Sequence, residues 1–169
     1  GQWRLLKVLA KLHEQGLDFQ IYFFGHFMGQ DGYQEFLQKL IHENHLEGSV
    51  YWCGVQDNPT ELMSYFDVIV LPSDQETFGL VLIEAMAAGV SVVGSRSGGV
   101  PEIIDEGVNG FTFEPESIDE FAQKMKLILG SSSLRDSFVK KGREKQMALF
   151  NKKNHYEELE KFFLGVIPH

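Results

Sequence analysis

The stretch that decides the fold is Pro72-Ser73-Asp74-Gln75-Glu76-Thr77-Phe78-Gly79-Leu80-Val81-Leu82-Ile83-Glu84-Ala85-Met86-Ala87-Ala88-Gly89. It follows a short apolar run at residues 68–71, which is typical of a parallel strand buried on both faces. Pro72 and Ser73 end that strand, and Thr77 is predicted to cap a helix that stops at Gly89. The stretch therefore predicts a strand, a turn and a helix in succession.

The predicted helix is apolar at every position from 80 to 88 except Glu84. A helix that is apolar all round is expected to be buried all round, where a lone carboxylate is costly unless something satisfies it. A helix N-terminus beyond the carboxyl end of a parallel strand favours anions, and Gly79 lets the backbone approach a ligand. Glu76 and Glu84 could thus face one ligand with a phosphate between two hydroxyl-rich ends, such as a nucleotide-sugar.

The rest of the chain alternates between the two kinds of element, which predicts the α/β class with a doubly wound parallel sheet. Helices are expected at residues 3–15, 33–44, 60–65, 118–129, 134–149 and 154–164, besides the one between Thr77 and Gly89 and a short one at Pro101. Strands are expected at residues 19–24, 50–52, 68–71, 90–93 and 111–113, the last at a sheet edge. Ser117 is the expected cap of the helix at 118–129, and residues 131–133 are expected to form a linker. Ligands of such sheets bind beyond the carboxyl ends of the strands.

Composition bounds the class of protein. The chain has 169 residues, 43% of them hydrophobic, which suits one domain with a sizeable core. Its formal net charge of −9 argues against nucleic acid or an anionic membrane as the main partner. The single cysteine, Cys53, excludes an internal disulfide and is expected to be a buried strand-end residue rather than a nucleophile. With no signal peptide and no membrane-spanning run, the expected location is cytoplasmic.

A family resemblance emerges from two motifs. Glu76 and Glu84, within E-T-F-G-L-V-L-I-E-A-M-A-A-G, resemble the E-x7-E signature of retaining glycosyltransferases with the GT-B fold, family 4. Residues 98–102 (G-G-V-P-E) and 107–110 (G-V-N-G) match the following family block. The resemblance implies a Rossmann-like nucleotide-sugar-binding domain at residues 1–150, the C-terminal half of a GT-B enzyme. It also implies a C-terminal helix within 151–169 that packs toward a missing N-terminal domain.

The beginning of the chain fits the same resemblance. Gly1 matches the last glycine of the family's Arg-x4-Lys-Gly signature, unless it is a remnant of a tag. The first strand, and the arginine and lysine that bind the donor diphosphate, are then expected to lie upstream of this chain. Their place outside the chain would explain why the central stretch holds no cation.

The resemblance also implies residue roles. Glu76, which contacts the hydroxyls of the donor sugar, and Glu84 are the expected catalytic pair. The donor diphosphate is assigned to Thr77, Phe78, Gly79 and Leu80. The nucleotide is assigned to Glu84, which accepts hydrogen bonds from the ribose, and to Gly25, His26 and Val55. For His26, a plain place in the strand-to-helix turn fits equally well.

Other polar groups favour structural interpretations. Asp74-Gln75-Glu76 resembles a D-x-D metal motif, but its neighbours match the metal-independent family, so no metal is expected. His42 and His45 lack an evident third ligand and are expected to be solvated residues at a helix end. Arg96 could pair with a carboxylate or face solvent, of which solvent is the expectation. Glu102 is expected to brace its loop.

The expected function is that of the donor-binding half of a retaining hexosyltransferase, a metal-independent enzyme that forms part of a longer chain. No cofactor is expected besides the donor substrate, a UDP-sugar or GDP-sugar. A glycan or lipid-linked acceptor would be held by the missing N-terminal domain. The expected pathway is the synthesis of cell-surface polysaccharide or lipopolysaccharide, with the full-length protein as a peripheral protein at the inner membrane face. Two alternatives stay open: a nucleotide-sugar 2-epimerase with the same fold, and a non-catalytic nucleotide-sugar-binding regulatory domain.

Overall fold

The structure, a computed structural model, describes residues 1–25 and 32–150. Its helices are α1 (Gln2–Glu14), α2 (Tyr33–Glu43), α3 (Pro59–Met63), α4 (Leu80–Ala88), α5 (Val100–Ile103), α6 (Ile118–Leu129) and α7 (Ser132–Leu149). Its strands are β1 (Ile21–Phe24), β2 (Val50–Gly54), β3 (Val68–Leu71), β4 (Ser91–Ser95) and β5 (Phe111–Phe113). The expected alternation of helices and strands is confirmed for this part of the chain. The helix expected at 154–164 lies outside the described residues.

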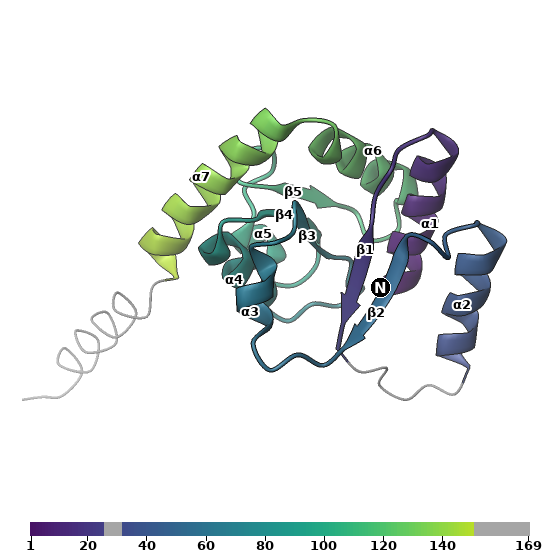
Figure 1. The fold of residues 1–169 in the computed structure, drawn as a ribbon. Coiled ribbons are helices and arrows are strands. Elements are labelled where there is room, and N and C mark those ends of the chain that lie inside the picture. The colour runs from purple at the N-terminus through teal and green to yellow at the C-terminus, as the bar shows by residue number, and fades with distance from the viewer. Residues whose placement is uncertain (26–31, 151–169) are drawn as a thin grey trace, which may run out of the picture.

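The strands form two parallel sheets. β1 pairs with β2, while β3, β4 and β5 form a second sheet in that order, with β5 at an edge. The α/β class with parallel strands is thus confirmed, but the strands divide between two sheets rather than one. Figure 1 shows the β1–β2 pair beside the three-stranded sheet. A cavity of about 950 Å³ is lined by residues of both β1 and β3. The first strand expected upstream of Gly1 stays a prediction.

The three-stranded sheet is covered on both faces. Val93 packs in one hydrophobic cluster with side chains of α1 and α6, while its neighbour Val92 packs in a second cluster with α4 and α5. Successive residues of a strand point to opposite faces, so this division places helices on both sides of the sheet. The burial of all five residues of β4 follows from that arrangement.

Two expectations about the elements need correction. Residues 68–71 are only half-buried, because the edge of β3 that is not paired with β4 borders the cavity. The linker expected at residues 131–133 is the start of α7, whose first turn is capped by the Ser131 hydroxyl accepting from the Leu134 amide at 3.2 Å. The cap expected at Ser117 is confirmed, since its hydroxyl accepts from the Glu120 amide at 3.2 Å.

Candidate donor-binding site

The β3–α4 loop, residues 72–79, brings the candidate diphosphate residues together where β3 ends. Gly79 is the N-cap of α4 with a φ of +95°, and no side chain caps this helix end. The predicted cap at Thr77 is therefore wrong, because the helix begins at Leu80 and Thr77 lies two residues before the cap position. Gly79 supplies the left-handed backbone that the turn requires. The first amides of α4 are left without a side-chain partner, as an anion site requires.

Glu76 is tied to its own loop. Its Oε1 accepts hydrogen bonds from the amides of Thr77, at 3.0 Å, and Phe78, at 3.4 Å. Because both bonds go to the same oxygen, they fix the direction of the carboxylate while Oε2 takes part in neither. The loop thus holds the Glu76 carboxylate in a fixed direction three residues before Gly79, the N-cap of α4.

The glycine pair of the second motif packs against the same loop. The Gly99 amide donates to the Thr77 carbonyl at 3.2 Å. A Cβ atom added at Gly98, whose φ is +51°, would lie 1.5 Å from the Glu76 carbonyl oxygen. One added at Gly99 would lie 2.9 Å from the Phe78 carbonyl oxygen. The two glycines therefore permit a close backbone approach that sets the path of the Glu76 loop.

Glu84 is exposed, which contradicts the prediction of a carboxylate buried in an apolar helix. The buried face of α4 consists of Leu82, Ile83, Ala85 and Met86. Leu80, which is 64% exposed, lies on the other face with Glu84 and Ala87. The exposure of Glu84 means that its burial cannot be an argument for a bound ligand. Glu84 follows Leu80 by four residues, however, so it lies one helical turn from Leu80 on the same exposed face of α4.

The nucleotide candidates lie on the other sheet. Gly25 directly follows β1 with a φ of +114°, and its amide donates to the Gly54 carbonyl at 2.8 Å. Val55, which is exposed, is the next residue after Gly54. Gly25 and Val55 are thereby brought together beyond the carboxyl ends of β1 and β2. His26 lies outside the described residues.

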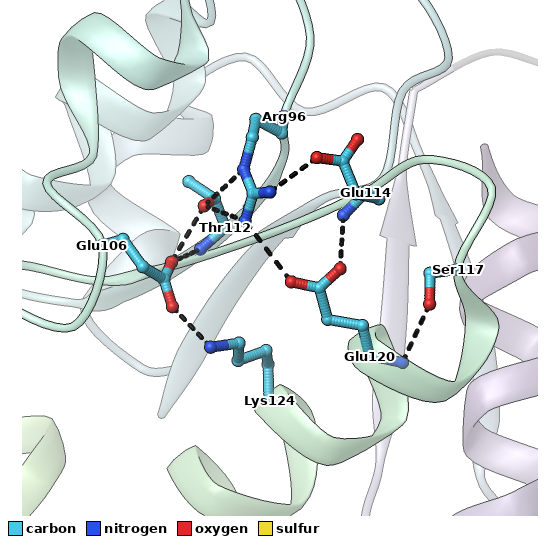
Figure 2. Close-up of polar contacts among 7 residues, drawn as sticks. All are labelled: Arg96, Glu106, Thr112, Glu114, Ser117, Glu120 and Lys124. Atoms are coloured by element: carbon cyan, nitrogen blue, oxygen red, sulfur yellow. Dashed lines mark hydrogen bonds and ion pairs between the residues drawn. The ribbon is translucent and has the colours of Figure 1, made fainter.

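Arg96 is ion-paired, which corrects the expectation that it faces solvent alone. Figure 2 shows its guanidinium between two carboxylates, with Nη1 2.6 Å from Glu114 Oε1 and Nη2 3.3 Å from Glu120 Oε1. Although burial acts to lower the pKa of Arg96, the hydrogen bond and charge of Glu114 and the charge of Glu120 raise it. Arg96, which directly follows β4, therefore links this strand to α6, and its charge is already paired within the fold.

Glu106 extends the same network toward α6. Its Oε1 accepts from Lys124 Nζ at 2.5 Å, and its Oε2 accepts from the Thr112 hydroxyl at 2.8 Å (Figure 2). Burial acts to raise the pKa of Glu106, but the hydrogen bonds from Lys124 and Thr112 outweigh it, so that the pKa lies below its usual value. The network connects β5 with α6 through charge-assisted hydrogen bonds.

Arg4 is a cation beside the candidate site that sequence reasoning missed. It is only 5% exposed, and its Nη1 forms an ion pair with Asp74 Oδ1 at the start of the β3–α4 loop. A signal was present in the sequence: Arg4 lies four and eight residues before Val8 and Leu12, on the apolar face of α1. An arginine at a core-facing helical position needs a carboxylate partner.

The candidate residues lie on an open surface. The large cavity reaches Pro72 and Ser73 but is not lined by Glu76 or Glu84. Within residues 1–25 and 32–150, no group of three metal-ligating side chains comes together. Glu102 is exposed on α5, and Cys53 is half-buried on β2. None of the described helices is both long and apolar enough to cross a membrane.

Known proteins share this architecture. Residues 1–145 match the family model of glycosyl transferases group 1. The chain is 33% identical over 129 residues to N-acetyl-alpha-D-glucosaminyl L-malate synthase of Bacillus anthracis, an alignment that covers 76% of this chain and 34% of that protein. It is 35% identical over 127 residues to a sulfoquinovosyl transferase of Arabidopsis thaliana, which covers 70% of this chain and 23% of that protein.

A solved structure agrees with the sequence relatives. The crystal structure of HepE from Anabaena in complex with UDP and glucose superimposes with a TM-score of 0.87 and 25% identity, over 99% of this chain and 45% of that one. The chain thus spans less than half the length of these relatives. With the family model matched from residue 1 to residue 145, the chain belongs to the glycosyl transferases group 1 family.

Proposed function

We propose that this chain is the donor-binding half of a retaining, metal-independent hexosyltransferase. It would bind a UDP-sugar or GDP-sugar whose sugar is passed to a glycan or lipid-linked acceptor held outside these residues. Membership of the glycosyl transferases group 1 family supports the reaction class, and the UDP and glucose bound to HepE support the donor class. A place in cell-surface polysaccharide or lipopolysaccharide synthesis, at the inner membrane face, is part of the same proposal.

The observation that carries the proposal is the uncapped N-terminus of α4, flanked by Glu76 before it and Glu84 one turn along its open face. The free amides and the helix dipole favour a diphosphate at this end. A carboxylate on each side can accept hydrogen bonds from sugar hydroxyls. The order of these groups along the loop and helix matches the order sugar, diphosphate, ribose.

Each group then has a role. The amides of Gly79 and Leu80, with the Thr77 hydroxyl and the Phe78 backbone, hold the diphosphate. They stabilise the charge that develops on the leaving phosphate, and one preorganised donor of this kind contributes about 3 kcal/mol to a barrier. Glu76 orients the donor sugar, Glu84 accepts from the ribose hydroxyls, and Gly25 and Val55 approach the base with His26.

Calorimetric titration of the full-length protein with UDP and with UDP-glucose tests these roles. Loss of a hydrogen bond to a charged group costs about 1.5–3 kcal/mol, so Glu84→Gln should weaken both ligands about 10- to 100-fold. Glu76→Gln should weaken UDP-glucose but leave UDP within a factor of about two, because Glu76 contacts only the sugar. Glu102→Gln, an exposed acid on α5, is the matched control. Unchanged affinity in both variants would refute the assignment.

Two further readings are separated by product analysis. A nucleotide-sugar 2-epimerase would convert the donor without an acceptor, and a regulatory domain would bind it without turnover. Incubation of the full-length protein with UDP-glucose, with and without added acceptor glycan, distinguishes these outcomes from acceptor-dependent release of UDP.

A further inference from the structure

Arg4 has an unusual environment for a charged residue. Its side chain is 6% exposed and lies over the Trp3 ring, with Cζ 4.5 Å from the ring centroid. Nη1 forms an ion pair with Asp74 Oδ1, and Nη2 lies 3.9 Å from Glu116 Oε1. Among the described residues, Nε and Nη1 have no hydrogen-bond acceptor in good alignment. A buried arginine with donors left over is a poor source of stability, because its desolvation offsets much of the attraction to its partner.

The partner of Arg4 lies in the loop that carries Glu76. Asp74 precedes Glu76 by two residues, and its side chain is half-exposed. One residue earlier, the Ser73 carbonyl accepts from the Ser95 hydroxyl at 2.5 Å. The Gly98–Gly99 turn contacts the far part of the loop, at Glu76, Thr77 and Phe78. The loop is therefore held at its start by Arg4 and Ser95 and at its end by the glycine pair.

We infer that Arg4 is a positioning residue that fixes the β3–α4 loop so that Glu76 is directed toward the sugar part of the donor. This inference rests on the proposed function for its ligand. The Arg4 guanidinium is buried against Trp3 in the first turn of α1, whereas the side chain of Asp74 in the loop is half-exposed. The ion pair with Arg4 fixes the direction of the Asp74 side chain. Because only Gln75 separates Asp74 from Glu76, the ion pair also constrains the backbone at Glu76.

The position of the ion pair also predicts which ligand responds to its loss. A change in the Glu76 loop alters the contact with the sugar, while the ribose and base are contacted from α4 and from the β1–β2 sheet. Arg4 should therefore matter for the sugar nucleotide and much less for the nucleotide alone. A residue that only stabilised the fold would affect both ligands in proportion.

The test compares Arg4→Met with the wild type at full length. Methionine fills similar apolar space, and the half-exposed Asp74 can take up water, so the variant is expected to fold. The affinity for UDP-glucose should fall about tenfold, with the affinity for UDP within about twofold. Amide exchange at Thr77 and Phe78, which donate to Glu76 Oε1, should become about tenfold faster. Asp74→Asn should reproduce both effects, and Arg4→Lys should restore them in part.

Lys11→Met is the matched control, because it breaks an exposed ion pair with Asp119 on the same helix. Lys11→Met should change neither the ratio of the affinities for UDP-glucose and UDP nor the amide exchange rates at Thr77 and Phe78 relative to wild type. Equal losses of UDP and UDP-glucose in Arg4→Met, or wild-type exchange at Thr77 and Phe78, would overturn the inference. If the wild type binds neither ligand, the proposed function fails, and the exchange rates at Thr77 and Phe78 still decide whether Arg4 fixes the loop.

Discussion

Gly98 sets how closely two backbone segments approach at the Glu76 loop. Replacement by alanine would place a Cβ atom 1.5 Å from the Glu76 carbonyl oxygen and would strain a backbone with a φ of +51°. Such strain costs about 1–3 kcal/mol, so Gly98→Ala should lower the melting temperature by several degrees, at about 2–4 °C per kcal/mol. Thermal unfolding followed by circular dichroism measures the change.

Gly107→Ala is the control for the backbone alone. Gly107 has a φ of +72° but nothing within 4 Å of an added Cβ atom. The excess loss in Gly98→Ala over Gly107→Ala therefore reports the collision with Glu76. Equal losses in the two variants would show that the loop moves aside without cost, contrary to the packing described.

At single residues, the sequence predicted the loop and helix of the site but not their exposure. Glu76 and the glycines around it fall together because they are contiguous with the end of β3. Glu84 was misjudged because an apolar composition around it suggested full burial, whereas the face it shares with Leu80 is open. Arg4 could not be connected with Asp74 from spacing, since the two lie 70 positions apart in the sequence and only tertiary packing joins them.

Among the elements, helix capping separates the sequence prediction from the structure. Ser117 caps α6 through its hydroxyl, while α4 has no side-chain cap. Loss of an N-cap hydroxyl costs about 1 kcal/mol, so Ser117→Ala should lower the free energy of unfolding by about that amount. Thr77→Ala should lower it by less than about 0.3 kcal/mol, as an exposed site away from a cap does. Urea unfolding of both variants measures these two free energies. An equal loss of stability in Thr77→Ala and Ser117→Ala would show that Thr77 does cap α4.

The link between β5 and α6 predicts a pH dependence. Because hydrogen bonds from Lys124 and Thr112 lower the pKa of Glu106 in the folded protein, its contribution to stability is full above the unfolded pKa of about 4.3. That contribution is lost as the pH falls through the lower folded pKa. Glu106→Gln should therefore melt about 1–3 °C below wild type at pH 7.

Melting curves between pH 3 and pH 7 follow this difference. The gap between wild type and Glu106→Gln should shrink as the pH falls below about 4. Glu144→Gln, which breaks an exposed pair with Lys141, is the control and should show a smaller gap throughout. A gap that is constant with pH would contradict the ionic role of Glu106.

Most elements could be predicted from the sequence because their apolar spacing is strong. α4 ends before Gly89 as predicted, but it begins at Leu80 instead of directly after Thr77, because Gly79 takes the N-cap position. Residues 131–133 were misassigned because serines are frequent both in linkers and at helix starts, and the hydroxyl of Ser131 serves as a cap. The separation of the strands into two sheets could not be predicted from spacing, which says nothing about which strands pair.

For the whole molecule, strand pairing predicts where the backbone is most protected. β4 is paired on both sides, by β3 and β5, while β1 and β3 each border the cavity between the sheets. Amides protected by ladders on both sides open only with larger parts of the fold. Hydrogen exchange should therefore be slowest in residues 91–95, with residues 21–24 and 68–71 at least about tenfold faster. Equal protection of all three strands would indicate that the cavity is closed in solution.

The same cavity has a consequence for handling the protein. Strand borders that no ladder occupies are templates for pairing with another molecule, and residues 19–24 and 68–71 are both rich in aromatic or β-branched side chains. Concentrated solutions of these 169 residues should accordingly form fibrillar precipitates on storage.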